Sequence, residues 1–362
     1  MTNSPTVAGS SSASGSPFSA TAPEKSTSDR PAQKRPIIAS TINFKGGVGK
    51  TTSCLNLAAA AYEEGLSVLI LDLDPQGSAT EFAKLKWGHQ GPTLYHWLIR
   101  GAPLQEVAVE IRGGGSEKNE RENSGSIFLC PADERLTKIQ HIFYTKGDSS
   151  YLKEALAEEA LADEAIAEET SSLETSSMDP SLREASSPEA SPFLRRFDFV
   201  FLDVPPSVSA FSENVLVASD LALLVLSCQF MSITGIRRFT DVLRRSHRAG
   251  AYPEWYILPT FYRPTEIESS LVWSRVAEVA KVYPEGRLLS PIGRFAAFGQ
   301  AFQTGKSIFE FDRGHTGAEQ FAAVFAEILE AAGQVDAPPQ ERTSGGDPSS
   351  GDPASEGDRP SE

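Results

Sequence analysis

Short, continuous apolar runs recur through the middle of this chain, and segments with helical character separate most of them. Continuous runs are typical of strands that are buried on both faces, as in a parallel sheet covered by helices. Strands that alternate with helices are joined by right-handed βαβ crossovers. The pattern therefore predicts an α/β fold, a mostly parallel twisted sheet with helices on both faces. The predicted strands are residues 37–42, 67–73, 127–131, 198–204, 220–227, 255–261 and 287–292.

The apolar pattern stops towards both ends of the chain and is interrupted once. Residues 1–35 are rich in Ser, Thr, Ala and Pro, and residues 334–362 are rich in Gly, Ser, Pro and Asp. Both compositions predict disordered tails, which leaves one folded domain at residues 36–333. Residues 151–169 are strong helix formers. The acidic stretch at about 160–192 predicts a flexible insert, which is either a tolerated insertion or a regulatory segment.

Composition limits the classes of protein that fit. The chain has 362 residues and a formal net charge of −15, and much of its acidity lies in the insert and the C-terminal tail. A basic patch on the folded domain therefore stays possible. Three cysteines without a CxxC pair argue against a zinc, iron–sulfur or disulfide framework. Because the chain lacks an apolar run long enough to span a membrane and a secretory signal, we expect a cytoplasmic protein with no membrane partner.

A glycine-rich turn between the first predicted strand and a helical segment carries the main chemical signal. Glycines let the backbone approach phosphate closely, and the following helix N-terminus adds N–H donors. Lys50 is expected on the β- and γ-phosphates, and the Thr51 hydroxyl on Mg²⁺. The turn departs from a standard Walker A loop, since Phe44 occupies a glycine position and Lys45 is an additional lysine. A plain glycine-rich turn is the alternative. The loop reads Lys45-Gly46-Gly47-Val48-Gly49-Lys50-Thr51-Thr52.

Two further apolar strands end in aspartate. The run at 67–73 leads to Asp72 and Asp74, and the run at 198–204 contains Asp203. Alternation along a strand places Asp72 and Asp74 on the same side, where a carboxylate holds the attacking water or a magnesium-bound water. Asp203 fits the Walker B role of presenting a carboxylate to Mg²⁺. The alternative for the first pair is that these aspartates cap the next helix.

Taken together, these motifs resemble the deviant Walker A ATPases, and most closely the ParA/Soj-type chromosome or plasmid partitioning ATPases. The similarity covers roughly residues 36–332, interrupted by the acidic insert. The residues that carry it are 45–52, 72–77, 129–132, 203–207, 258–262, 305–312 and 317–319.

The resemblance implies a P-loop ATPase that forms a sandwich dimer with ATP and Mg²⁺ at the interface. It assigns Lys45 to the partner subunit's phosphates, which explains the additional lysine, and Asp74 to the orientation of the attacking water. It places Thr51, Asp74 and Asp203 around Mg²⁺, and Thr260 and Pro291 near adenine. It also implies slow hydrolysis stimulated by a ParB-like partner, and nonspecific DNA binding by the dimer, with nucleoid association. The full set expected on the nucleotide is Gly46, Gly47, Val48, Gly49, Lys50, Thr51, Thr52, Thr260 and Pro291.

Two departures from the family pattern affect the DNA-binding expectation. Arg263 lies where the family has an Asp-x-Arg-Thr stretch, and Arg294 matches the first of two family arginines whose second is Ala297 here. Arg263 and Arg294 are therefore the DNA candidates. An arginine-rich run at 237–248 either compensates or forms a solvated helix face. A MinD-like or other cargo-positioning ATPase without DNA binding is the alternative function, although the acidic C-terminus lacks a membrane-binding amphipathic helix.

Overall fold

The eight strands form one twisted sheet in the order β3-β4-β2-β5-β1-β6-β7-β8. All neighbouring strands are parallel except β3 and β4, which pair antiparallel at the edge. The computed structural model describes residues 35–85, 90–113, 125–139, 149–160, 193–207, 210–228, 233–283 and 285–335. The strands are β1 (Ile37–Ile42), β2 (Val68–Asp72), β3 (Val109–Arg112), β4 (Ile127–Cys130), β5 (Phe199–Asp203), β6 (Leu221–Ser227), β7 (Glu254–Thr260) and β8 (Gly286–Leu288).

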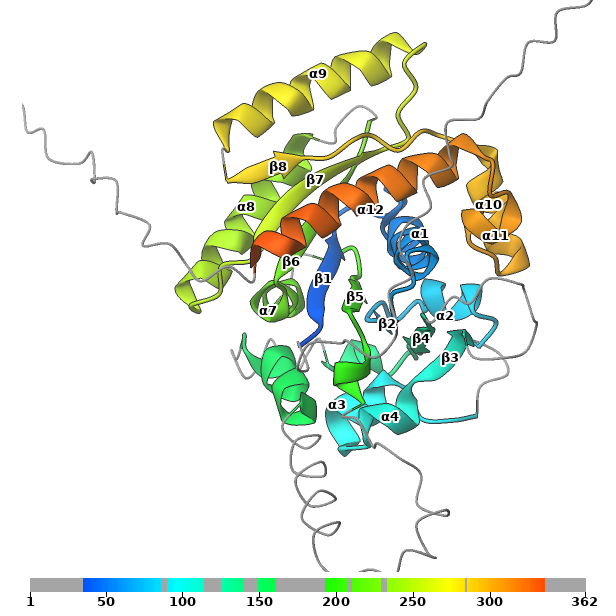
Figure 1. Cartoon of the computed structure of the whole chain (residues 1–362). Helices are drawn as coiled ribbons and strands as arrows, with labels where there is room; N and C mark the ends of the chain where they lie inside the picture. The colour runs from blue at the N-terminus through cyan, green and yellow to red at the C-terminus, as the bar shows by residue number, and fades with distance from the viewer. Residues whose placement is uncertain are drawn as a thin grey trace, which may run out of the picture. The chain divides into compact units, whose positions relative to one another are not determined.

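Helices cover both faces of this sheet (Figure 1). On β5 the side chains alternate between two cores: Phe199 and Phe201 pack into the core that includes helices α1 and α12, whereas Val200 and Leu202 pack into the core of α3, α7 and α8. Burial on both faces explains why the strands read as continuous apolar runs. The helices are α1 (Lys50–Glu63), α2 (Ser78–Phe82), α3 (Leu94–Arg100), α4 (Leu104–Val107), α7 (Ala210–Ala218), α8 (Ile233–Arg248), α9 (Ile267–Val282), α10 (Ala296–Thr304), α11 (Ile308–Phe311) and α12 (Thr316–Val335).

The observed sheet confirms the predicted α/β class and all seven predicted strands, with two differences. The prediction missed β3, a short edge strand whose side chains are only partly buried. The last predicted strand, 287–292, is too long at its C-terminal end, because β8 stops at Leu288. Beyond it, the Ile292 N–H donates to the Pro259 carbonyl oxygen (2.8 Å), and Gly293 forms an isolated parallel bridge with Tyr262, so the chain continues alongside the end of β7.

Several predictions concern segments outside the described residues. The predicted helix at 151–169 is helical over its described part, 151–160. The rest of that helix and the acidic insert after residue 160 lie outside the described residues, as do 1–34 and 336–362. None of the helices in the described part of the chain combines the length and apolar character that crossing a membrane requires.

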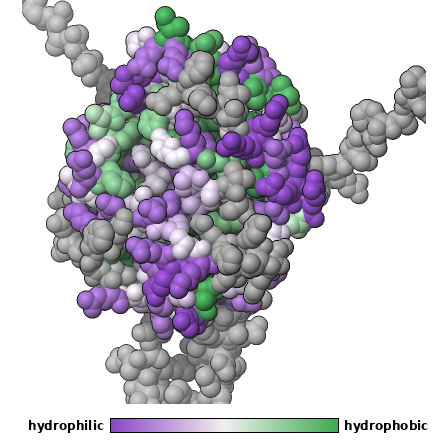
Figure 2. Space-filling model, turned by 180° about the vertical axis from the view of Figure 1, so that it is seen from behind, coloured by the Kyte–Doolittle hydropathy of each residue, from purple (hydrophilic) through white to green (hydrophobic). Residues whose placement is uncertain are grey.

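The outer face of α9 differs from the other helix surfaces. Ile267, Leu271 and Val282 are exposed there, Ile267 by 88%. Figure 2, which views the molecule from behind, shows hydrophobic residues near its upper edge, where α9 lies, among mostly hydrophilic surroundings. The first turn of this helix follows the loop at the carboxyl end of β7, which is the edge of the sheet that carries the glycine-rich turn.

Candidate functional site

The glycine-rich turn leaves β1 and leads directly into α1, as the sequence predicts. Gly47 and Gly49 adopt left-handed backbone conformations, with φ of 72° and 93°, which favour glycine. Gly49 is the N-terminal cap of α1, and its carbonyl accepts the Ser53 N–H at 2.8 Å. A Cβ added at Gly46 or Gly47 would meet no heavy atom of the described residues within 4 Å. The turn therefore surrounds open space at a helix N-terminus, the arrangement that binds phosphate.

The side chains of Asn43, directly after β1, and Thr260, at the end of β7, hold the turn in place. The Asn43 side-chain amide donates to the Val225 carbonyl oxygen on β6 (2.6 Å), and the Asn43 side-chain oxygen accepts the Lys45 N–H (3.0 Å). The Thr260 hydroxyl at the end of β7 donates to the Val48 carbonyl oxygen (2.7 Å). The turn is thus fixed to β6 and β7 as well as to its own strand.

The two lysines of the turn occupy different environments. Lys50 is buried, with 7% of its surface exposed, and its ammonium donates to the Lys45 carbonyl oxygen at 3.3 Å. Burial lowers the pKa of Lys50, although the nearby carboxylates of Asp203 and Asp74 oppose the shift. The side chain of Lys45, in contrast, is exposed. Lys50 therefore points into the loop, and Lys45 is available to groups outside it.

A pair of buried carboxylates lies beside Lys50. Asp72 and Asp203 are aligned on the neighbouring strands β2 and β5. Both oxygens of Asp203 are buried without a hydrogen-bond partner among the described residues. Burial and the charge of Asp72 raise the pKa of Asp203, against the smaller opposing effects of Thr51 and Lys50. Two unpartnered buried oxygens need a cation or a proton, so Asp203 has the donor atoms and the environment that fit a magnesium site.

Asp72 and Asp74 have different partners, although they lie two residues apart. Asp72 accepts hydrogen bonds from the Thr80 N–H (2.8 Å) and hydroxyl (2.7 Å), so it anchors the first turn of α2. For Asp72, the helix-capping alternative is therefore the better description. Asp74 is half-buried and accepts the Gln76 N–H at 3.0 Å.

Asp74 interacts electrostatically with both Lys50 and Asp203. Asp74 opposes the lowering of the Lys50 pKa and contributes to the raised pKa of Asp203. Within the described ranges, no group of three or more His, Cys, Asp and Glu side chains forms a ready-made metal site. The carboxylates of Asp203 and Asp74 suit Mg²⁺, which proteins hold through one or two carboxylates together with phosphate oxygens and water.

The opposite flank of the turn is made by the loops that follow β7 and β8. Thr260 is buried, and Pro291 is half-buried beside Ile292. The Tyr262 N–H donates to the Ile292 carbonyl oxygen (3.0 Å), which joins the two loops. Of the residues predicted to bind nucleotide, Thr260 thus contacts the turn itself, and Pro291 lies in the loop that follows β8.

The arginines predicted to contact DNA lie in the loops that follow β7 and β8. Arg294 is exposed, and its backbone N–H donates to the Tyr262 carbonyl oxygen (3.2 Å). Arg263 forms an ion pair with Glu266 at 2.6 Å, and both side chains are 46% exposed. The charge of Arg263 is therefore partly offset, whereas Arg294 presents its charge to solvent.

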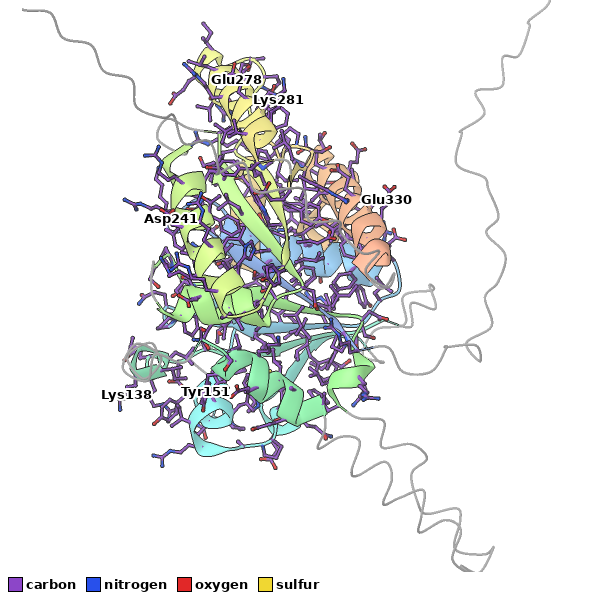
Figure 3. The ribbon with its side chains drawn as sticks, turned by 90° about the vertical axis from the view of Figure 1, so that its left-hand side faces the viewer. Lys138, Tyr151, Asp241, Glu278, Lys281 and Glu330 are labelled. Atoms are coloured by element: carbon purple, nitrogen blue, oxygen red, sulfur yellow. The ribbon has the colours of Figure 1, made fainter. Side chains whose placement is uncertain are left out.

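Helix α8 carries more arginines, which differ in their ion pairs and exposure. Arg244 pairs with Asp241 (2.9 Å), and Arg245 pairs with Glu213 of α7 (3.0 Å). Arg237 and Arg238 are exposed on the same helix. Asp241 marks the outward side of α8 in Figure 3.

Two features of the site were missed from the sequence. Asn43 fixes the turn to β6, and its position between a strand and a glycine-rich turn was the available signal. Phe261 adopts a left-handed backbone conformation with φ of 55° beside the turn. A phenylalanine carries no sequence signal for that conformation, which glycine and asparagine usually adopt.

Comparison with known proteins agrees with this geometry. Residues 36–250 match the model of an AAA domain family, AAA_31. The chain is 24% identical to the chromosome partitioning protein ParA of Myxococcus xanthus over 293 residues, which cover 79% of this chain and 86% of that protein. It is 25% identical to the chromosome-partitioning ATPase Soj of Thermus thermophilus over 287 residues, which cover 79% and 93% of the two chains.

Solved structures share the fold at lower identity. A McdA variant of Cyanothece in complex with ATP superposes with a TM-score of 0.60 at 20% identity, covering 83% of this chain and 97% of that one. A plasmid partition protein of Borrelia burgdorferi bound to AMPPNP superposes with a TM-score of 0.56 at 17% identity, covering 82% and 100%. These similarities support the same sheet and helix arrangement.

Proposed function

The chain belongs to the AAA_31 family of AAA domains and is a ParA-type ATPase, and from this premise we propose that it is an ATP-dependent dimerising switch in chromosome or plasmid partitioning. The observation that carries the proposal is the convergence of Lys50, Thr51, Asp74 and Asp203 on an open glycine turn. In this proposal, a ParB-like partner stimulates slow ATP hydrolysis, and the ATP dimer associates with the nucleoid.

Each side chain of the cluster has a role in hydrolysis. Lys50 and the N–H groups of the turn bind the phosphates. Thr51, Asp74 and Asp203 would hold Mg²⁺, and the bound ion would neutralise negative charge on the phosphates. The Asp74 carboxylate also accepts a hydrogen bond from the water that attacks the γ-phosphorus, while the bond from that phosphorus to the β–γ bridging oxygen breaks.

In this proposal, Lys45 links ATP binding to dimer formation. Its side chain is exposed at the leading edge of the turn, while the Lys50 ammonium donates to the Lys45 carbonyl oxygen inside the loop. We infer that Lys45 binds the phosphates held by a second copy of the chain, so that each nucleotide joins two subunits. ADP lacks the γ-phosphate, and the dimer then separates.

The test is the oligomeric state measured by light scattering after size-exclusion chromatography with ADP, ATP or a non-hydrolysable ATP analogue. We expect wild type to dimerise with ATP and the analogue but not with ADP. Lys45→Ala should bind ATP and remain monomeric, whereas Lys50→Ala should lose ATP binding. Lys306→Ala removes another exposed lysine, between α10 and α11, and should behave as wild type.

Two outcomes contradict the proposal. If Lys45→Ala dimerises as well as wild type, Lys45 does not act across the interface. If wild type stays monomeric with ATP and with the analogue, the chain is not an ATP-dependent dimerising switch.

DNA binding is the part of the proposal that depends on exposed arginines. Arg294 and exposed arginines of α8, among them Arg237 and Arg238, supply positive charge on a chain whose net charge is −15. Contacts to phosphates alone bind duplex DNA without sequence preference and weaken steeply with salt.

A cargo-positioning ATPase that does not bind DNA is the second candidate, and one observation favours it. Arg263 is paired with Glu266, and Ala297 replaces an arginine of the family pattern. Retention of the ATP-loaded chain on nonspecific duplex DNA at low salt distinguishes the two functions, since a cargo-positioning ATPase of this kind would not be retained.

A further inference from the structure

Phe261 has an unusual backbone conformation at the edge of the proposed nucleotide site. Its φ is 55°, and Lys84 is the other non-glycine residue with positive φ among the described residues. A bulky L-residue is unfavourable in the left-handed region. Such conformations persist where the surrounding structure imposes them, and they concentrate at ligand sites.

Hydrogen bonds on both sides of Phe261 impose this conformation. Before it, the Thr260 hydroxyl donates to the Val48 carbonyl oxygen, and the Thr260 carbonyl accepts the Cys228 N–H, both at 2.7 Å. After it, the Tyr262 N–H donates to the Ile292 carbonyl oxygen at 3.0 Å. The chain is thus held between the glycine turn and the loop after β8.

The result is an aromatic ring placed against the glycine turn. The ring tip of Phe261, its Cζ, lies 3.7 Å from where a Cβ of Gly49 would be. The side chain is half-buried, so part of the ring stays open to solvent. An aromatic ring that is packed at its tip and partly exposed is suited to stacking on a planar ligand group.

The strand order indicates which part of a nucleotide reaches this ring. Asp203 ends β5 and Asp74 follows β2, and both strands lie on one side of β1, whereas β6 and β7 lie on the other side (Figure 1). Carboxylates and Mg²⁺ draw the terminal phosphates towards the β5 side. The sugar and base then extend towards β7, where Phe261 lies.

We propose that Phe261 stacks on the nucleobase and provides the affinity that distinguishes a nucleoside triphosphate from free triphosphate. This inference rests on the proposed ATP-binding function. Stacking depends on the area of the aromatic faces and not on hydrogen-bond patterns. The contribution is therefore expected for both ATP and GTP, and is smaller for the pyrimidine nucleotides.

The test measures, by calorimetry with Mg²⁺, the binding of ATP and of inorganic tripolyphosphate to the full chain. We expect Phe261→Ala and Phe261→Gly to weaken ATP about tenfold, equivalent to ~1.4 kcal/mol, and to change tripolyphosphate affinity less than twofold. Phe261→Tyr keeps the aromatic face and should bind ATP within about twofold of wild type.

The glycine variant separates stacking from folding. Glycine adopts positive φ readily, so Phe261→Gly relieves the backbone conformation and keeps the loop folded. A selective loss of ATP affinity in that variant is then a loss of the ring. Lys84→Gly relieves the same kind of conformation after α2 and should leave both affinities unchanged.

Three outcomes overturn the inference. An equal loss for ATP and tripolyphosphate would mean that Phe261 shapes the glycine turn instead of contacting the base. Unchanged affinity for both ligands would mean that the ring does not face the nucleotide. If wild type binds neither ligand, the proposed function fails, and this inference fails with it.

Discussion

The adjacent carboxylates of Asp72 and Asp203 determine how the protonation of the site depends on pH. Burial raises the pKa of Asp72 to about 6, and two hydrogen bonds from Thr80 oppose this rise. At Asp203 the opposing effect of Thr51 is smaller than that of burial, and burial beside Asp72 raises its pKa to about 8. At neutral pH, Asp203 thus holds a proton unless a cation replaces it. We infer that metal binding releases a proton from this site.

The stability of the nucleotide-free protein should therefore depend on pH through Asp203. A carboxyl whose pKa rises from 3.8 to about 8 on folding stabilises the folded state fully below about pH 4, and this contribution is lost as pH rises towards 8. Between pH 6 and 8, wild type should lose on the order of 2 kcal/mol, most of it through Asp203, because Asp72, whose pKa is about 6, completes its ionisation early in this range. Asp203→Asn should lose much less. The measurement is the Tm at pH 6 and pH 8 in EDTA.

The control for this experiment is Asp241→Asn, which removes an exposed carboxylate on α8. Its Tm should fall with pH as in wild type. If Asp203→Asn falls as steeply as wild type, the ionisation of Asp203 does not set the pH dependence.

At the scale of elements, the strands and the nucleotide loop were predictable because they depend on local pattern. β5 reads as a continuous apolar run because its side chains enter two cores, and the glycine turn lies directly between β1 and α1. β3 was missed, since Val109–Arg112 is a half-exposed edge strand whose pairing with β4 depends on tertiary contacts.

The parts of the site that were not predictable depend on residues distant in sequence. Asp72 accepts hydrogen bonds from Thr80. The left-handed conformation of Phe261 follows from the hydrogen bonds that its neighbours Thr260 and Tyr262 make to Val48 and Ile292. The sequence placed the candidate magnesium and phosphate ligands at the carboxyl ends of adjacent strands. It did not distinguish the structural aspartate, Asp72, from Asp203, whose oxygens are unpartnered.

Helix α8 is the element that should decide DNA binding. Arg237→Glu combined with Arg238→Glu should weaken binding of the ATP-loaded protein to nonspecific duplex DNA. The slope of log K against log salt should become shallower by about 2 per subunit, because each phosphate contact contributes roughly 0.9. The measurement is fluorescence anisotropy across a salt series.

A charge-matched control separates the α8 surface from net charge. Arg275→Glu with Lys281→Glu makes the same charge change on α9, whose Lys281 lies at the top of the view in Figure 3. This control should bind DNA more tightly than the α8 variant does. Equal weakening in both variants would show that overall charge, and not α8, governs binding.

For the whole molecule, the proposed switch couples nucleotide state to assembly through one edge of the sheet. Lys45 faces outward there, Lys50 faces inward, and Asp74 lies in the charge cluster beside them. In the proposed switch, assembly needs the γ-phosphate and separation needs its removal. The lifetime of the dimer is then set by the hydrolysis rate, and a change that slows hydrolysis without affecting binding should lengthen it.

Asp74→Ala makes that change. The variant removes the carboxylate proposed to orient the attacking water and keeps Lys45, Lys50 and Asp203. We expect steady-state phosphate release to fall at least about tenfold, since positioned acid–base groups typically contribute 10²–10⁴-fold. The ATP dimer should persist during size-exclusion chromatography longer than the wild-type dimer. Equal phosphate release in both proteins would remove Asp74 from hydrolysis, whereas reduced release without a longer-lived dimer would separate hydrolysis from disassembly and contradict the switch.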